Sequence, residues 1–202
     1  MQQAEETGRF FKAYLERHPY LDRVVLETSP FMRTMQTAAG IGRILGLPKV
    51  QVNYTYCEWM STKLFDDEQL HSLMLSRANK GEKYTIEEIE KDYLGGVQID
   101  RETVCNGFEE AILYHPEGSK TVKARSKRII DHLISKFDTL EEERTLHIVV
   151  THGFQLHYFS SMHGGEGHHP DYCAKTAVAI RRSDSFRRDI IFDCCSAHVS
   201  QK

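Results

Sequence analysis

Two residues of the chain could together bind a phosphate group, and each follows a short apolar run. Arg33 lies in the first turn of a helix expected after residues 23–27, and His152 follows residues 146–150. A helix N-terminus favours an anion because its backbone N–H groups are unpaired and carry partial positive charge. A guanidinium in that turn adds a planar, bidentate donor that suits phosphate, and an imidazole can add a third donor. These two residues therefore predict a phosphate pocket.

The elements that must position these two side chains are a pair of strands and the helices that follow them. Residues 23–26 and 146–150 are apolar runs too short for helices, which is typical of buried parallel strands. Ser29 and Pro30 are expected to cap and open the first helix, and Gly46 stands where its C-terminal cap belongs. In such sheets functional residues lie at the carboxyl ends of the strands, so both side chains should lie there.

The remaining periodicity predicts an α/β protein. Apolar residues recur at helical spacing in further segments, and other runs have the length of strands. Helices are expected over about 3–18, 119–137 and 154–162, and strands over 49–53, 173–181 and 187–195. Helices that alternate with strands indicate a three-layer sandwich with a largely parallel central sheet.

The stretch from about residue 54 to 118 has weaker periodicity and is predicted to be a helical and loop insertion. Short helices are expected near 66–78 and 85–93. A chain of 202 residues, 40% of them hydrophobic, can bury one good core. Residues 1–202 are therefore expected to form a single domain with the insertion on one edge.

The composition argues against several partners and locations. The net charge of −3 leaves no basic field for nucleic acid or anionic lipid, so neither is an expected partner. No apolar run approaches the ~18 residues that a membrane helix needs. The polar N-terminus does not resemble a targeting peptide, so a cytoplasmic protein is expected. The five cysteines include no Cys-x-x-Cys pair and are expected to be reduced thiols.

Three motifs resemble those of the histidine phosphatase superfamily, the phosphoglycerate mutase-like proteins. Residues 26–38, LETSPFMRTMQTA, are similar to the family's S-S-P-x-x-R-x-x-Q-T-A signature. Residues 149–153, VVTHG, match its V-V-T-H-G motif, and residues 57–59, CEW, match its acidic position after the next strand. Three motifs in the right order and spacing are far more specific than any one of them.

The resemblance implies a phosphoglycerate mutase-like fold and a phosphohistidine mechanism that needs no metal or other cofactor. Arg33 would bind the phosphate, and His152 would hydrogen-bond the phosphoryl oxygens and stabilise charge in the transition state. Glu58 would protonate the leaving oxygen as general acid and then activate water as general base. The ligand would be a phosphorylated small molecule or a phosphoprotein, and the reaction that of a phosphatase or a mutase. Without their motifs, these residues would more often be surface or structural ones.

The chain departs from the family at its N-terminus. The family's first strand ends in Arg-His-Gly, whose histidine is the nucleophile, whereas this chain begins within the helix that would follow. Arg17 and His18 form the only Arg-His pair, but they end a helix and lie too close to Arg33 to be a substitute. The chain is therefore expected to be N-terminally truncated, without the first strand, which is central in the family's sheet, and without the nucleophile.

Three functions stay open on the sequence alone. The first is a phosphatase or mutase that is incomplete as given. The second is a catalytically dead pseudo-phosphatase that binds a phosphate ligand or a protein. The third is a scaffold that binds a protein partner through the insertion at 54–118.

Two further clusters of polar residues have plainer interpretations than a site. One is Gly-rich and has no standard ligand spacing, so a solvated loop is expected there rather than a metal site. The other is basic and is expected to be the solvated face of an amphipathic helix. The clusters are His163, Glu166, His168 and His169, and Lys120, Lys123, Arg125, Lys127 and Arg128.

Overall fold

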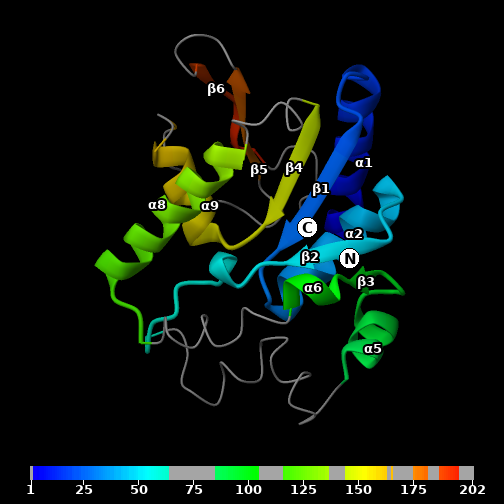
Figure 1. Ribbon diagram of the computed structural model, residues 1–202, viewed down its shortest axis with the longest axis horizontal. Coiled ribbons are helices and arrows are strands. Elements are labelled where there is room, and N and C mark those ends of the chain that lie inside the picture. The colour runs from blue at the N-terminus through cyan, green and yellow to red at the C-terminus, as the bar shows by residue number, and fades with distance from the viewer. Residues whose placement is uncertain are drawn as a thin grey trace.

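The chain folds as an α/β protein around a parallel sheet (Figure 1). The computed structural model describes residues 2–63, 85–104, 116–136, 144–162, 165, 175–181 and 187–195. Four strands, β1 (Arg23–Thr28), β2 (Lys49–Val52), β3 (Gln98–Ile99) and β4 (Thr145–Val150), form one sheet in the order β3-β2-β1-β4. Every neighbouring pair in this sheet is parallel. The expected α/β class with a parallel sheet is confirmed.

A second, separate sheet is formed by the last two strands. They are β5 (Lys175–Arg181) and β6 (Arg187–Cys195), and they pair antiparallel. Within the described residues β4 is therefore an edge strand of the parallel sheet, and no ladder joins it to β5 or β6.

Helices connect the strands and pack in two groups. They are α1 (Gln2–Arg17), α2 (Met32–Leu45), η1 (Tyr54–Tyr56), α5 (Ile86–Glu88), η2 (Ile89–Tyr93), α6 (Arg101–Val104), α8 (Ser119–Lys136) and α9 (Gly153–Met162). Helix α1 packs on α2, α8 packs on α9, and Figure 1 shows the two pairs on opposite sides of the sheet. None of the helices in the described ranges is long and apolar enough to cross a membrane.

The order of the strands explains this division. The chain steps from β1 through α2 to β2, and later returns from β3 through α8 to β4 at the opposite edge. Parallel crossovers are right-handed, so steps in opposite directions place their helices on opposite faces of the sheet. The direction in which the chain moves across the sheet therefore reverses at the boundary between β1 and β4. In sheets of this kind the carboxyl ends of the strands at such a switch point are where ligands bind.

Most expected elements are confirmed to within two residues at their ends, but the start of α2 is not where the sequence placed it. Helix α2 begins at Met32, and its N-cap is Phe31, whose side chain makes no capping hydrogen bond. Ser29 is not the cap, and Pro30 precedes the helix instead of opening it. The Ser29 Oγ lies 2.8 Å from the His152 Nε2, and it accepts only a long hydrogen bond, at 3.5 Å, from the N–H of Phe31. At the other end, Gly46 is the cap as predicted, with φ of 72°.

The stretch 54–118 contributes to the sheet as well as to loops. The helix expected near 85–93 is present as α5 and η2, and its first residue, Thr85, makes a capping box with Glu88. The helix expected near 66–78 lies outside the described residues. Strand β3 was not predicted, because two paired residues are too few to give a recognisable strand pattern.

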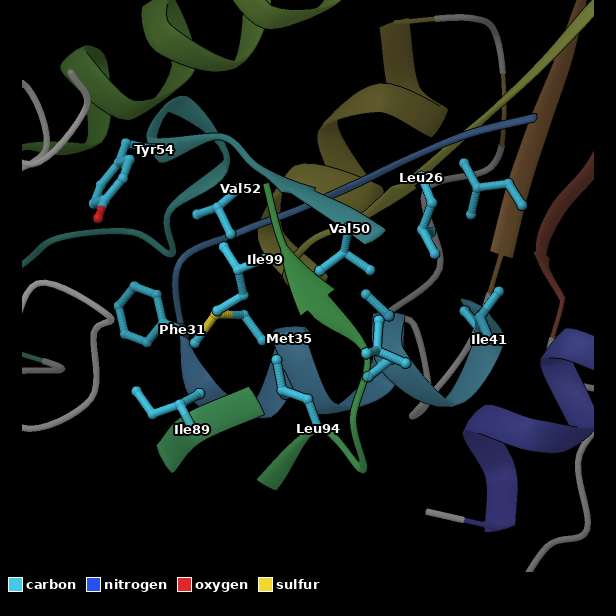
Figure 2. Packing of buried hydrophobic residues seen from close by; sticks show 14 of the residues in the cluster. Leu26, Phe31, Met35, Ile41, Val50, Val52, Tyr54, Ile89, Leu94 and Ile99 are labelled. Atoms are coloured by element: carbon cyan, nitrogen blue, oxygen red, sulfur yellow. The ribbon is translucent and has the colours of Figure 1, made fainter. Parts of the chain in front are cut away.

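The main core lies between the sheet and helix α2, and it fixes the segment that carries Arg33. Figure 2 shows labelled side chains of β1, β2, β3, α2 and the 89–94 segment packed together. Phe31 and Met35, on either side of Arg33, are completely buried in this cluster. The backbone of the first turn of α2 is therefore held by packing, while Arg33 itself projects from the core.

Candidate functional site

The structure brings the side chains of Arg33, Glu58 and His152 together at the carboxyl edge of the sheet. The Arg33 Nη2 lies 3.0 Å from the His152 Nδ1 and 3.4 Å from the Glu58 Oε2. The Glu58 Oε2 is in turn 3.3 Å from the His152 Nδ1. Arg33 follows β1, His152 follows β4, and Glu58 follows η1 after β2. These three are the residues that the sequence singled out.

A fourth residue, Ser29, belongs to the same group and was missed as a site residue. Its Oγ lies 2.8 Å from the His152 Nε2, and both residues are buried. The sequence interpretation gave Ser29 a capping role because a serine before a helical pattern usually has one. No local signal could have revealed the pair, since the two residues are 123 positions apart.

The hydrogen-bond partners assign the protonation of His152. Burial lowers the pKa of His152 well below its usual value, and the positive charges of Arg33 and Arg125 lower it further. The imidazole is therefore neutral at pH 7. The Arg33 guanidinium can only donate, so the His152 Nδ1 accepts, and the ring proton must lie on Nε2. That Nε2–H then donates to the Ser29 Oγ.

The surroundings of Ser29 and Cys57 argue against either residue as a nucleophile. A serine nucleophile needs an unprotonated imidazole nitrogen to take its proton, but the nitrogen beside Ser29 already carries one. Ser29 is also completely buried. Next to Glu58, the Cys57 thiol is completely buried as well, and burial raises its pKa to about 12. The reactive thiolate form is therefore negligible near neutral pH.

We expect His152 to make the fold less stable in acid. The unfolded chain binds a proton at its usual histidine pKa of about 6.5, whereas the folded imidazole does so only at lower pH. Its effect is absent well above pH 6.5 and grows as pH falls, by up to about 1.4 kcal/mol per pH unit. Urea unfolding at pH 7, 6 and 5 should show a shallower acid loss in His152→Gln, which cannot titrate. An equal loss in both proteins would contradict the assignment.

The loop that carries Glu58 is held from one side by a buried ion pair. The Arg125 Nε and Nη2 donate to the two carboxylate oxygens of Glu117 at 2.9 and 2.8 Å. The same guanidinium donates to the backbone carbonyls of Thr55, Cys57 and Glu58 at 2.8 to 2.9 Å. One side chain of α8 therefore satisfies three carbonyls of this loop and fixes its path.

Arg125 corrects the sequence interpretation of helix α8. The charge pattern predicts a solvated position for it, together with four other basic residues, but only 1% of it is exposed. Its position could have been predicted from spacing. Val122 and Ile130 are buried, and Arg125 and Ser126 fall between them at helical intervals on the same buried stripe. The charge suggested solvent, whereas the buried Glu117 carboxylate supplies its partner.

The β4–α9 segment holds the same loop from the other side. The Thr151 hydroxyl donates to the Tyr56 carbonyl at 3.0 Å, and the Gln155 amide donates to the Cys57 carbonyl. The Tyr56 hydroxyl reaches β1, where it donates to the buried Glu27 carboxylate at 2.9 Å. The distance between Glu58 and His152 is therefore set by backbone segments that are tied to each other.

The Arg17-His18 pair lies at the other edge of the sheet from this group. His18 stacks on Tyr14 with ring centroids 4.1 Å apart, and its carbonyl accepts from the N–H of Leu21, just before β1 begins. The site follows the end of β1, and a strand of six residues spans roughly 20 Å. The expectation that His18 does not replace the nucleophile is consistent with this placement.

The group has the properties of an anion site with a proton donor or acceptor beside it. Helices α2 and α9 both begin beside these residues, and a helix N-terminus favours negative charge. The Arg33 side chain is 49% exposed, so its guanidinium can reach a ligand, whereas the Glu58 side chain is 18% exposed.

No family model matches the chain, and no curated protein is significantly similar to it. The cluster from His163 to His169 lies outside the described residues, apart from Gly165.

Proposed function

We propose that this site binds a phosphate monoester and belongs to a histidine-phosphatase-type enzyme, a phosphatase or a phosphomutase. The observation that carries the proposal is the contact of Arg33 with His152 beside the Glu58 carboxylate, at the topological switch point. A guanidinium and two helix N-termini suit a doubly charged, tetrahedral anion. The sequence resemblance implies the same task for these three residues.

In the proposed reaction an imidazole nitrogen attacks phosphorus, and the bond from phosphorus to the ester oxygen breaks. Glu58 in its protonated form gives its proton to that oxygen. Water then attacks the phosphohistidine, Glu58 takes a proton from the water, and phosphate leaves. Arg33 stabilises the charge on the phosphoryl oxygens throughout. The resemblance assigns His152 the same task, which requires its Nδ1 to exchange the contact with Arg33 for a proton that it donates to the bound phosphoryl group.

The part of the chain that the structure describes offers no evident nucleophile for the first step. Among the histidines that the structure describes, only His152 contacts Arg33 and Glu58, and both of its ring nitrogens already have partners. This observation favours the second candidate function, a pseudo-phosphatase that binds the ligand without turning it over.

The topology fits the finer proposal of a phosphoglycerate mutase-like fold that lacks one strand. In that fold the strand with the nucleophile lies inside the sheet. Here β4 ends the described parallel sheet, and β5 and β6 pair separately. A further strand beside β4 would place its carboxyl end, and an Arg-His-Gly there, next to His152.

Both candidate functions predict that the 202-residue chain does not hydrolyse 4-nitrophenyl phosphate. We expect the 202-residue chain to give only the background rate, because Glu58 cannot replace a nucleophile. The coding sequence upstream of Met1 then decides between them. An in-frame apolar strand ending in Arg-His-Gly, and a longer protein that loses its activity on Glu58→Gln, would support the enzyme. A stop codon just upstream would support the binding protein. A robust rate abolished by His18→Ala would contradict both.

A further inference from the structure

Three aromatic side chains form a row on the two segments that carry Glu58 and His152. The rings of Trp59 and Phe154 have centroids 5.7 Å apart, and Phe154 stacks on Tyr158 at 6.4 Å with an interplanar angle of 5°. Trp59 is the residue after Glu58, and Phe154 is the second residue after His152. The row therefore begins at the two segments that supply the proton-transfer and phosphate-binding groups.

The row is not part of the main core. Its members are each partly exposed, and within the described residues none belongs to the buried cluster or packs directly against it. The Trp59 indole N–H donates to the Glu117 carbonyl at 2.9 Å, so a hydrogen bond as well as ring contact fixes its orientation. The same Glu117 is the partner of Arg125, which holds the Glu58 carbonyl. The Arg125–Glu117 ion pair therefore positions both Trp59 and Glu58.

The placement of this row suggests what the rest of the ligand must be. The residue that protonates the ester oxygen is Glu58, so the group beyond that oxygen must lie near Glu58. In an aryl phosphate a single oxygen joins phosphorus to the ring, whereas in a nucleotide the sugar separates them. Aromatic rings prefer offset or edge-to-face contact at centroid distances of about 4.5–7 Å. A row that begins one residue from Glu58 fits the first geometry better.

Resting on the proposed function, we propose that Trp59 and Phe154 form a platform for the leaving group and that the site prefers aryl phosphate monoesters. The phosphate lies at Arg33 and His152, and the ring of the ester packs on the platform. An aliphatic phosphate makes only the first set of contacts. The preference for an aromatic ester is therefore a property of the platform, and affinity for inorganic phosphate is a property of Arg33.

The test uses the 202-residue chain, because binding does not require turnover. Trp59 is its only tryptophan, so its fluorescence reports directly on the platform. Phenyl phosphate, glycerol 2-phosphate, adenosine 5′-monophosphate and inorganic phosphate are titrated, and calorimetry gives each Kd. We expect phenyl phosphate to bind about tenfold more tightly than glycerol 2-phosphate, as one buried ring contact provides. It should also change the Trp59 emission saturably.

Two variants of α9 separate the platform from general effects of aromatic residues. Phe154→Leu should remove the advantage of phenyl phosphate and leave the Kd of inorganic phosphate unchanged. Phe159→Leu is the matched control, because five helical residues turn it about 140° away from Phe154. Its phenyl phosphate affinity should be that of the parent.

The outcomes distinguish this inference from the proposed function. Binding of all phosphates with equal affinity would overturn the platform and leave the phosphate site intact. An advantage of adenosine 5′-monophosphate over phenyl phosphate would overturn the aryl assignment. No binding of any of the four ligands would overturn both proposals.

Discussion

Replacing Arg125 by methionine is expected to lower the free energy of unfolding by about 3–5 kcal/mol, the usual cost of removing one partner of a buried ion pair. The change leaves the fully buried Glu117 carboxylate without its bidentate partner. It also removes the donor to the carbonyls of Thr55, Cys57 and Glu58. Urea unfolding of the variant measures the loss directly.

Two comparisons show whether the loss comes from the ion pair. Lys127→Met removes a charge from the same helix at an exposed position, and we expect a change within about 0.5 kcal/mol. The double variant Arg125→Met with Glu117→Leu removes both buried charges and should recover part of the stability. If the double variant loses as much stability as Arg125→Met and Glu117→Leu lose separately, the destabilisation comes from the loop carbonyls that have lost their donor. If Arg125→Met is as stable as Lys127→Met, the buried pair contributes nothing.

The second large effect is expected on the affinity for phosphate. Arg33→Ala should weaken the binding of inorganic phosphate or orthovanadate by about 10- to 100-fold, since hydrogen bonds to charged groups contribute about 1.5–3 kcal/mol. The phosphate affinity of Arg33→Lys should lie between those of the parent and Arg33→Ala, because an ammonium keeps the charge but lacks the planar arrangement of donors. Calorimetric titration gives the three dissociation constants.

Replacing Glu58, which lies beside Arg33, should raise the affinity for phosphate. The Glu58 carboxylate lies 3.4 Å from the guanidinium and competes with an anion for it. Glu58→Gln removes a negative charge from the site, so we expect phosphate to bind more tightly. Arg9→Ala is the control, because it removes an exposed arginine from α1 and should leave the affinity unchanged. Equal weakening by Arg33→Ala and Arg9→Ala would place the anion elsewhere.

The sequence predicted most of the elements because strands and helices here have clear apolar patterns. The run at 146–150 could be recognised as a strand without its partner, and Gly46 marked the end of α2 through a backbone conformation that glycine favours. Strand β3 could not be recognised, because its two paired residues depend on β2 for their identity as a strand. The predicted N-terminal boundary of α2 was wrong because the Ser29 hydroxyl pairs with His152, which follows β4 and is distant in the sequence.

The candidate site shows the same division between local and distant information. Arg33 and His152 could be predicted because each follows its own strand, and parallel strands end at one edge. The Ser29–His152 pair and the Arg125–Glu117 pair depend on side chains that tertiary packing brings together. Of these, Arg125 alone carried a usable signal, since helical spacing places it on the buried stripe of α8.

The most direct test of the central claim is to follow the side-chain resonances of Arg33 and His152 while inorganic phosphate is added. In a ¹⁵N-labelled sample the guanidinium and imidazole nitrogens can be assigned with the Arg33→Ala and His152→Gln variants. We expect both sets of signals to shift together and to saturate with one dissociation constant. In the Arg33→Ala variant the His152 shift should then be lost. Saturable shifts confined to other residues, or no saturable shift at all, would contradict a phosphate site at this edge of the sheet.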